Sequence, residues 1–193
     1  MNMEIIKMEN KDNTVLLNIE ILDETIIVKN DNFEKINKTK IKLLDLDYKN
    51  QTYIGVDPGT KNLGLATIYP NTSEEILEAN LYRVVLDRDD DAVKRMLVVR
   101  SVLSNLNIWY RWGCPAVIEG ASFGNHYRQV EIAEQRASIA LWCNTRGMRV
   151  KIVPPKTIRK HSFGDGTVKN PWDNLEDNMA AALGAALYGY KNV

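Results

Sequence analysis

The sequence has 193 residues, of which 45% are hydrophobic and 26% charged, and its 25 basic and 25 acidic residues leave no net charge. This length and composition fit one globular domain with, at most, a small addition. No apolar run approaches the roughly 20 residues that span a bilayer. The first residues lack the apolar core of a secretion signal, and Cys114 and Cys143 stand apart from each other, outside any zinc-binding spacing. We expect a soluble cytoplasmic protein that does not contact a membrane.

Residues 1–50 differ from the rest of the chain. Short β-branched runs alternate there with clusters of Asn, Asp and Lys, and the run at 15–28 is interrupted by a turn signal that predicts a hairpin. The stretch at 33–48 predicts a further extended segment. We therefore expect a small β-rich appendage at 1–50 and the main domain at 51–193.

The main domain opens with three strand-like runs, at 53–57, 63–69 and 76–86. Pro58 lacks a backbone donor and Gly59 permits a positive φ, so this dipeptide ends the first run. The later elements are predicted as a helix at 92–112, a strand at 116–118, a helix at 126–145, a strand at 149–153, a polar basic connector and a helix at 175–190. The order predicts an α/β fold in which a three-strand meander is followed by αβαβα, with helices on both faces of a mixed sheet.

Acidic residues fall at the ends of these elements. Asp57 ends the first strand of the main domain and Glu119 follows the strand at 116–118, while Asp173 and Asp177 lie at the start of the last helix. If the two strands are parallel neighbours, their carboxylates lie side by side and repel each other unless cations neutralise them. Mg²⁺ or Mn²⁺ prefers such oxygen ligands. Two such ions about 4 Å apart can drive phosphodiester hydrolysis.

Each acid also has a structural interpretation. Asp57 can cap its own turn, and Glu119 can pair with an arginine such as Arg128. Asp173 and Glu176 form the D-x-x-E pattern of a capping box. Asp177 lies one helical turn after Asp173 and precedes a run of small residues, so we expect Asp177 to be the ligand of this helix.

Three strings of residues resemble a known family when taken in order. They are GVDPGTKNLGLATI at 55–68, VIEGASF at 117–123 and EQRASIALW at 134–142, and a Lys-rich connector with Gly164-Asp165-Gly166 and a helix-borne acid follow them. Over residues 53 to 190 this set resembles the RuvC-type Holliday-junction resolvases of the RNase H-like superfamily. The resemblance implies an RNase H-like core, a homodimer and Mg²⁺-dependent nicking of four-way DNA junctions without a small-molecule cofactor.

Carried over residue by residue, the resemblance assigns Asp57, Glu119 and Asp177 as catalytic acids that hold two metal ions. The family usually carries D-x-x-D at the last helix, and the position three residues before Asp177 is Asn174 here, with Asp173 one residue earlier. The fourth catalytic metal ligand is therefore Asp173 or Asn174, and we expect Asp173, because a neutral amide is the weaker Mg²⁺ ligand. The chain also lacks the helix that the family inserts before the last acid, and residues 1–50 have no counterpart in the usual members.

Basic residues are concentrated between the fifth strand and the last helix. From 146 to 169 the chain has seven Lys or Arg and one acid, which is the local excess that phosphate binding requires in a protein without net charge. Phe123, just past Glu119, either stacks on unpaired bases or packs under the helix start. The predicted DNA-binding residues are Phe123, Tyr127, Arg128, Lys156, Arg159, Lys160, His161 and Lys169, with Lys156 or Lys160 and Lys169 matching the family's basic pair.

Three other functions remain open from the sequence. Asp57-Pro58-Gly59-Thr60 partly fits the phosphate loop of actin-like or sugar-kinase-like ATPases, but no second glycine-rich phosphate turn follows. A RuvC-like nuclease that acts on another branched or single-stranded nucleic acid, of the type found in mobile elements, would carry the same acids. A DNA-binding module that does not cut would not need them.

Overall fold

The computed structural model describes residues 4–8, 15–22, 33–42, 51–71, 76–86, 91–105, 113–121, 126–172 and 175–193. Their strands form one eight-stranded sheet in the order β1-β2-β3-β6-β5-β4-β7-β8. The strands are β1 (Glu4–Met8), β2 (Val15–Leu22), β3 (Phe33–Lys42), β4 (Tyr53–Asp57), β5 (Asn62–Asn71), β6 (Ile76–Val85), β7 (Pro115–Glu119) and β8 (Arg149–Val153). The helices are α1 (Ala92–Asn105), α2 (His126–Thr145), α3 (Pro155–Phe163) and α4 (Asp177–Asn192).

The order of the strands confirms the predicted mixed sheet. β4, β5 and β6 form an antiparallel meander, β7 lies parallel to β4 on its other side, and β8 lies parallel to β7. The two strands that were expected to be parallel neighbours are therefore adjacent. Their carboxyl ends meet at one edge of the sheet, the position at which α/β proteins bind ligands.

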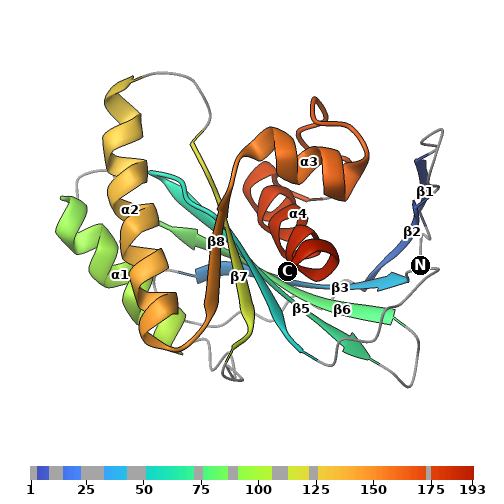
Figure 1. The fold of residues 1–193 in the computed structure, drawn as a ribbon, viewed down its shortest axis with the longest axis horizontal. Coiled ribbons are helices and arrows are strands. Elements are labelled where there is room, and N and C mark those ends of the chain that lie inside the picture. The colour runs from blue at the N-terminus through green and yellow to red at the C-terminus, as the bar shows by residue number, and fades with distance from the viewer. Residues whose placement is uncertain are drawn as a thin grey trace.

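Helices cover both faces of the sheet, as Figure 1 shows: α1 and α2 lie on one side, and α3 and α4 on the other. Alternation along β4 distributes its side chains between the two cores. Ile54 and Val56 pack with Val99 of α1 and Ile139 of α2, while Tyr53 packs with the apolar residues of α4. Among the helices of the described segments, none is long and apolar enough to cross a membrane.

The predicted connector after β8 proves to contain a helix. Pro155 occupies the first turn of α3, where its fixed φ favours the helix and its missing N–H costs nothing. The helix ends at Gly164, whose φ of 79° is left-handed. Ile158 and Phe163 are buried against the α4 side of the sheet. The prediction was wrong because the polar residues of this short stretch outnumber the few apolar ones that anchor it.

Two predicted helix limits shift. The last helix begins at Asp177 instead of residue 175, so that Glu176 is the residue before its first turn. The helix after the meander is described as far as Asn105, and its predicted extension to residue 112 lies outside the described residues.

The strands of residues 1–50 continue the main sheet. β3 runs antiparallel to β6, with Ile41 opposite Leu77 and Ile36 opposite Tyr82, and β2 and β1 follow outside β3. β2 matches the first arm of the predicted hairpin, and the second arm, at 25–28, lies outside the described residues. Whether the segment is a separable unit remains a prediction.

Two glycines allow α4 to lie directly on the backbone of β4 and β5. A Cβ at Gly55 would lie 1.9 Å from the carbonyl oxygen of Ala182, and a Cβ at Gly64 would lie 2.0 Å from that of Asn178. Any side chain at either glycine would push the helix away from the sheet. This close approach brings the first turn of α4 over the carboxyl end of β4, where Asp57 stands.

Candidate active site

Asp57 and Glu119 stand at the same level on adjacent parallel strands. Val56 pairs with Ile118 in the register of β4 and β7, and the two acids are the next residues along. Each follows a run of four buried residues, which ends where the strand leaves the core. The sequence thus folds two carboxylates into one corner of the sheet, as predicted.

Asp177 joins them from α4, of which it is the first residue. The three acids line one open groove of about 550 Å³. Its lining consists of Asp57, Gly59, Thr60, Lys61, Asn62, Glu119, Arg159, Lys169, Asp177, Asn178 and Ala181. The groove therefore draws on the turn after β4, the end of β7, α3, the connector and the start of α4.

The environment of the two strand-end acids opposes their ionisation. Burial, and then repulsion from Glu119, raises the pKa of Asp57 well above its ordinary value, and burial raises the pKa of Glu119. The guanidinium groups of Arg159 and Arg136 act in the other direction on both acids. Oε2 of Glu119 is buried and accepts no hydrogen bond from the described residues. A buried carboxylate oxygen without a partner is costly, so this pair is suited to binding a cation.

The oxygen ligands of this site fit a hard divalent cation, but its three described acids are not all close enough to share one ion. Asp57 and Glu119 offer carboxylate oxygens, the ligands that Mg²⁺ and Mn²⁺ prefer. Across the described part of the chain, no three His, Cys, Asp or Glu side chains are grouped closely enough to share one ion. Asp177 lines the same groove, and its Oδ1 accepts a hydrogen bond of 3.2 Å from Asn170. The fourth-ligand candidates, Asp173 and Asn174, lie outside the described residues.

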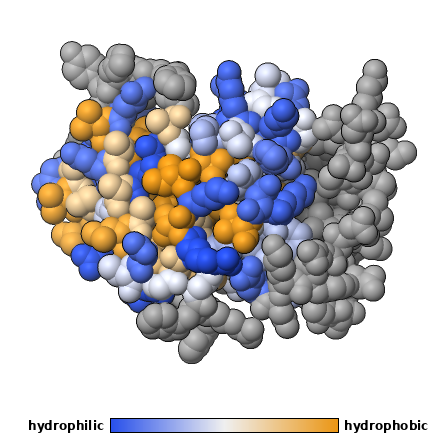
Figure 2. Space-filling model, viewed as in Figure 1, coloured by the Kyte–Doolittle hydropathy of each residue, from blue (hydrophilic) through white to orange (hydrophobic). Residues whose placement is uncertain are grey.

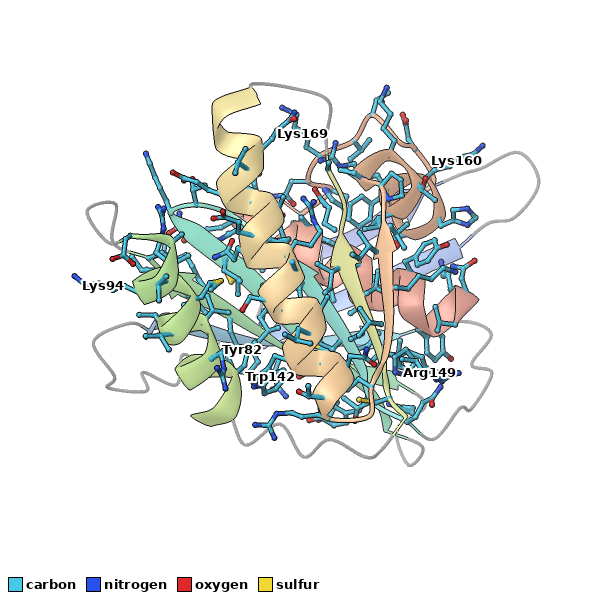
Figure 3. The ribbon with its side chains drawn as sticks, turned by 60° about the vertical axis from the view of Figure 1, so that its left-hand side comes forward. Tyr82, Lys94, Trp142, Arg149, Lys160 and Lys169 are labelled. Atoms are coloured by element: carbon cyan, nitrogen blue, oxygen red, sulfur yellow. The ribbon has the colours of Figure 1, made fainter. Side chains whose placement is uncertain are left out.

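Cationic side chains border the acids. Arg159, on α3, and Lys169, on the connector, both line the groove, as the sequence analysis expected of DNA-binding residues. Lys156 and Lys160 are exposed on α3, and Figure 3 shows Lys160 and Lys169 at the same end of the molecule.

Of the remaining predicted DNA-binding residues, the structure describes the side chain of His161 alone, and it does not line the groove. The imidazole of His161 packs edge-on against the ring of Tyr188, with the centroids 5.4 Å apart. Phe123 lies outside the described residues. Tyr127 and Arg128 belong to the first turn of α2, and their side chains are not described.

Three residues of this site were not predicted from the sequence. Nε of Arg136, on α2, donates a hydrogen bond of 3.0 Å to the main-chain carbonyl of Glu119. Lys61 and Asn178 line the groove. Arg136 belongs to the EQRASIALW string, which carried the resemblance without a role for its arginine. Lys61 follows the Pro58-Gly59 turn so closely that its position in the groove that Asp57 lines could have been expected.

The fold is RuvC-like, of the RNase H-like type. A structure of RuvC from Thermus thermophilus superposes with a TM-score of 0.57 at 18% sequence identity, over 70% of this chain and 91% of that one. A structure of T. thermophilus RuvC in complex with a Holliday junction substrate superposes with a TM-score of 0.57 at 15% identity, over 73% of this chain and 96% of that one. No protein-family model matches the sequence, and no curated protein matches it. At such identities the likeness establishes the fold alone.

Proposed function

We propose that this protein is a metal-dependent endonuclease that resolves four-way DNA junctions by paired, symmetric nicks. The observation that carries the proposal is the partly buried pair Asp57 and Glu119 at the ends of adjacent parallel strands, in a groove shared with Asp177. Neighbouring carboxylates of this kind serve to bind cations, and the surrounding lysines and arginines suit a phosphodiester backbone.

The residues divide into two roles. Asp57, Glu119 and Asp177 would hold two metal ions between them, with Asp173 proposed as the fourth ligand. When bound, the two Mg²⁺ or Mn²⁺ ions would supply an activated water and stabilise the leaving oxygen of the phosphodiester. Arg159 and Lys169 would bind the phosphates next to the scissile bond, because both line the same groove as the acids.

Four-way DNA as the substrate is supported by the RuvC structure that contains a Holliday junction. Symmetric nicking requires two active sites, so we propose a homodimer. Figure 2 shows apolar surface gathered over the side of the molecule where α1 and α2 lie. Val130 and Leu141 of α2 are more than half exposed there, at 62% and 65%. Exposed apolar side chains on one helix face are suited to association with a second copy.

One observation favours a different substrate for the same chemistry. Between Lys169 and Asp177 the described residues form no helix, whereas the family that the sequence resembles carries a further helix at this place. A shortened connector would grip DNA differently. The second candidate is therefore a RuvC-like nuclease that acts on flaps or single strands.

Product analysis separates the two candidates. The purified protein is incubated with Mg²⁺ and with end-labelled four-way junctions, flaps, duplexes and single strands of matched sequence. Junction resolution predicts two nicks placed symmetrically across the junction and little cleavage of the other substrates. Preferential cleavage of flaps or single strands would favour the second candidate, and no cleavage of any substrate would contradict both.

A further inference from the structure

Arg136 lies directly behind the carboxylate pair, on the helix that follows β7. Its Nε donates to the carbonyl oxygen of Glu119 at 3.0 Å, across seventeen positions of the chain. Its side chain is partly buried. A charged donor that is fixed to a main-chain carbonyl in such a place is worth more than a surface contact.

The peptide at the end of β7 is held from two sides. The N–H of Gly120 donates to the carbonyl of Val153 on β8 at 2.7 Å, while the carbonyl of Glu119 accepts from Arg136. A Cβ at Gly120 would lie 3.1 Å from the same Val153 oxygen, so the chain passes close to β8 at this point. These contacts fix the backbone from which the Glu119 side chain projects.

The positive charge of Arg136 also lies near both acids, Asp57 and Glu119. Its guanidinium interacts electrostatically with Glu119 and with Asp57. Arg159 reaches the same two acids from α3, which covers the opposite face of the sheet from α2. Two cations on opposite sides make it less costly for two partly buried carboxylates to lie close together.

We infer that Arg136 is a positioning residue, which holds the Glu119 peptide so that the free Oε2 of Glu119 is directed to the metal before the metal arrives. This inference rests on the proposed metal-dependent function. Residues that orient metal ligands from behind typically change metal affinity about 10–100-fold when they are removed.

The sign of the effect separates this role from simple charge balance. Removing a positive charge beside two carboxylates should, by itself, strengthen their attraction for a divalent cation. Losing the support of the Glu119 peptide should weaken binding. A residue that only stabilised the fold would lower the unfolding temperature without changing the affinity of the folded protein for metal.

The test measures Mg²⁺ and Mn²⁺ binding to the full chain by calorimetry, without DNA. The proteins compared are the wild type, Arg136→Met, Arg136→Lys and a control, Arg100→Met. The control removes an exposed charge on α1. We expect Arg136→Met to weaken binding about 10-fold or more, Arg136→Lys to weaken it less because its ammonium keeps the charge but not the planar donor, and the control to leave it unchanged. Unchanged or tighter binding in Arg136→Met would overturn the inference. If Arg136→Met does not fold, Arg136→Lys decides by the same criterion.

Failure of the inference and failure of the proposed function have different signatures. A wild-type protein that binds Mg²⁺ but cuts no nucleic acid would contradict the proposed function and leave the role of Arg136 intact. Wild-type cleavage together with unaffected metal binding in Arg136→Met would contradict the inference alone. Absence of Mg²⁺ binding in the wild type would contradict both.

Discussion

Arg83 and Glu176 form an ion pair with 2.8 Å between Nη1 and Oε2, and this pair ties the start of α4 to β6. Glu176 immediately precedes Asp177, and its carbonyl accepts the hydrogen bond from Ala180 that opens the helix. Arg83 pairs with Gly64 across β5 and β6, directly below the first turn of α4. The pair therefore fixes the residue from which Asp177 is presented to the groove.

We expect Glu176→Gln to lower the rate of metal-dependent cleavage about 10-fold. Its effect on the free energy of unfolding should be about 1 kcal/mol or less, because the pair is partly exposed. Cleavage rates and thermal unfolding are measured on the same preparation. Glu131→Gln is the matched control. Glu131, on α2, is similarly exposed and forms an ion pair of 3.4 Å with Arg95 on α1. Equal effects of the two substitutions on cleavage would argue against a special role for Glu176.

The raised pKa values predict how the stability of the metal-free protein depends on pH. Because burial raises the pKa of Asp57 and of Glu119, the folded state keeps protons that the unfolded state releases between the ordinary and the raised values. Stability should therefore fall as pH rises through that window. Saturating Mg²⁺ should flatten the dependence, since it favours the ionised acids.

Thermal unfolding in a chelator and in Mg²⁺, from about pH 4 to about pH 8, measures this dependence. Asp57→Asn removes the acid whose pKa is raised most clearly, so in chelator it should raise the unfolding temperature at the upper end of the range. A metal-free wild type that becomes steadily more stable as the pH rises would refute the prediction. So would an Asp57→Asn variant with an undiminished pH dependence.

The N-terminal strands offer a test of domain organisation. We predict that deleting residues 1–48 leaves a folded core that still requires Mg²⁺ for cleavage, because α4 packs on β4, β5, β6 and β7, and the predicted active-site acids all follow residue 50. Circular dichroism, thermal unfolding and junction cleavage measure the outcome. Since β3 pairs along β6, global unfolding of the truncated chain would show instead that β3 completes the sheet.

The fourth ligand can be identified by substituting the two candidates one at a time. Asp173 lies three positions before Glu176, which directly precedes the first turn of α4, so Asp173→Ser should keep the helix start. If Asp173 is a ligand, as we propose, the loss of its negative oxygen should lower cleavage by orders of magnitude. Asn174→Ala should have a smaller effect, because a neutral amide is a weaker Mg²⁺ ligand. Full activity in Asp173→Ser together with loss in Asn174→Ala would reverse the assignment.

The fold, and the position of Asp57 and Glu119 at the ends of two strands, could be predicted from the sequence because their signals are local. Asp57 and Glu119 each follow a short apolar run, and a glycine turn or a glycine residue follows directly. Strand ends of this kind can be recognised without knowing the partner strand. The parallel direction of β4 and β7 then follows from the chain between them, because β6 runs parallel to β4 and the helix α1 joins β6 to β7.

The rest of the site depends on contacts between residues far apart in the sequence, which cannot be predicted from local patterns. Arg136, which hydrogen-bonds to Glu119, lies in the middle of α2. Arg83, which hydrogen-bonds to Glu176, lies on β6, the last strand of the meander. In the sequence, Gly55 and Gly64 look like ordinary strand glycines, and only the structure shows that α4 packs directly on them. These relationships depend on where helices cross the sheet, which periodicity alone does not specify.

Cleavage of a labelled four-way junction by wild type and by Asp57→Asn, with and without Mg²⁺, tests the central claim most directly. Asp57 ends β4 and lines the groove, and we propose that its carboxylate serves the metal and not the fold. We predict symmetric nicks by the wild type in Mg²⁺ only, no nicks by Asp57→Asn, and junction binding by the variant that is equal to or tighter than wild type in a gel-shift measurement. Cleavage by Asp57→Asn at a rate near that of the wild type would contradict the account.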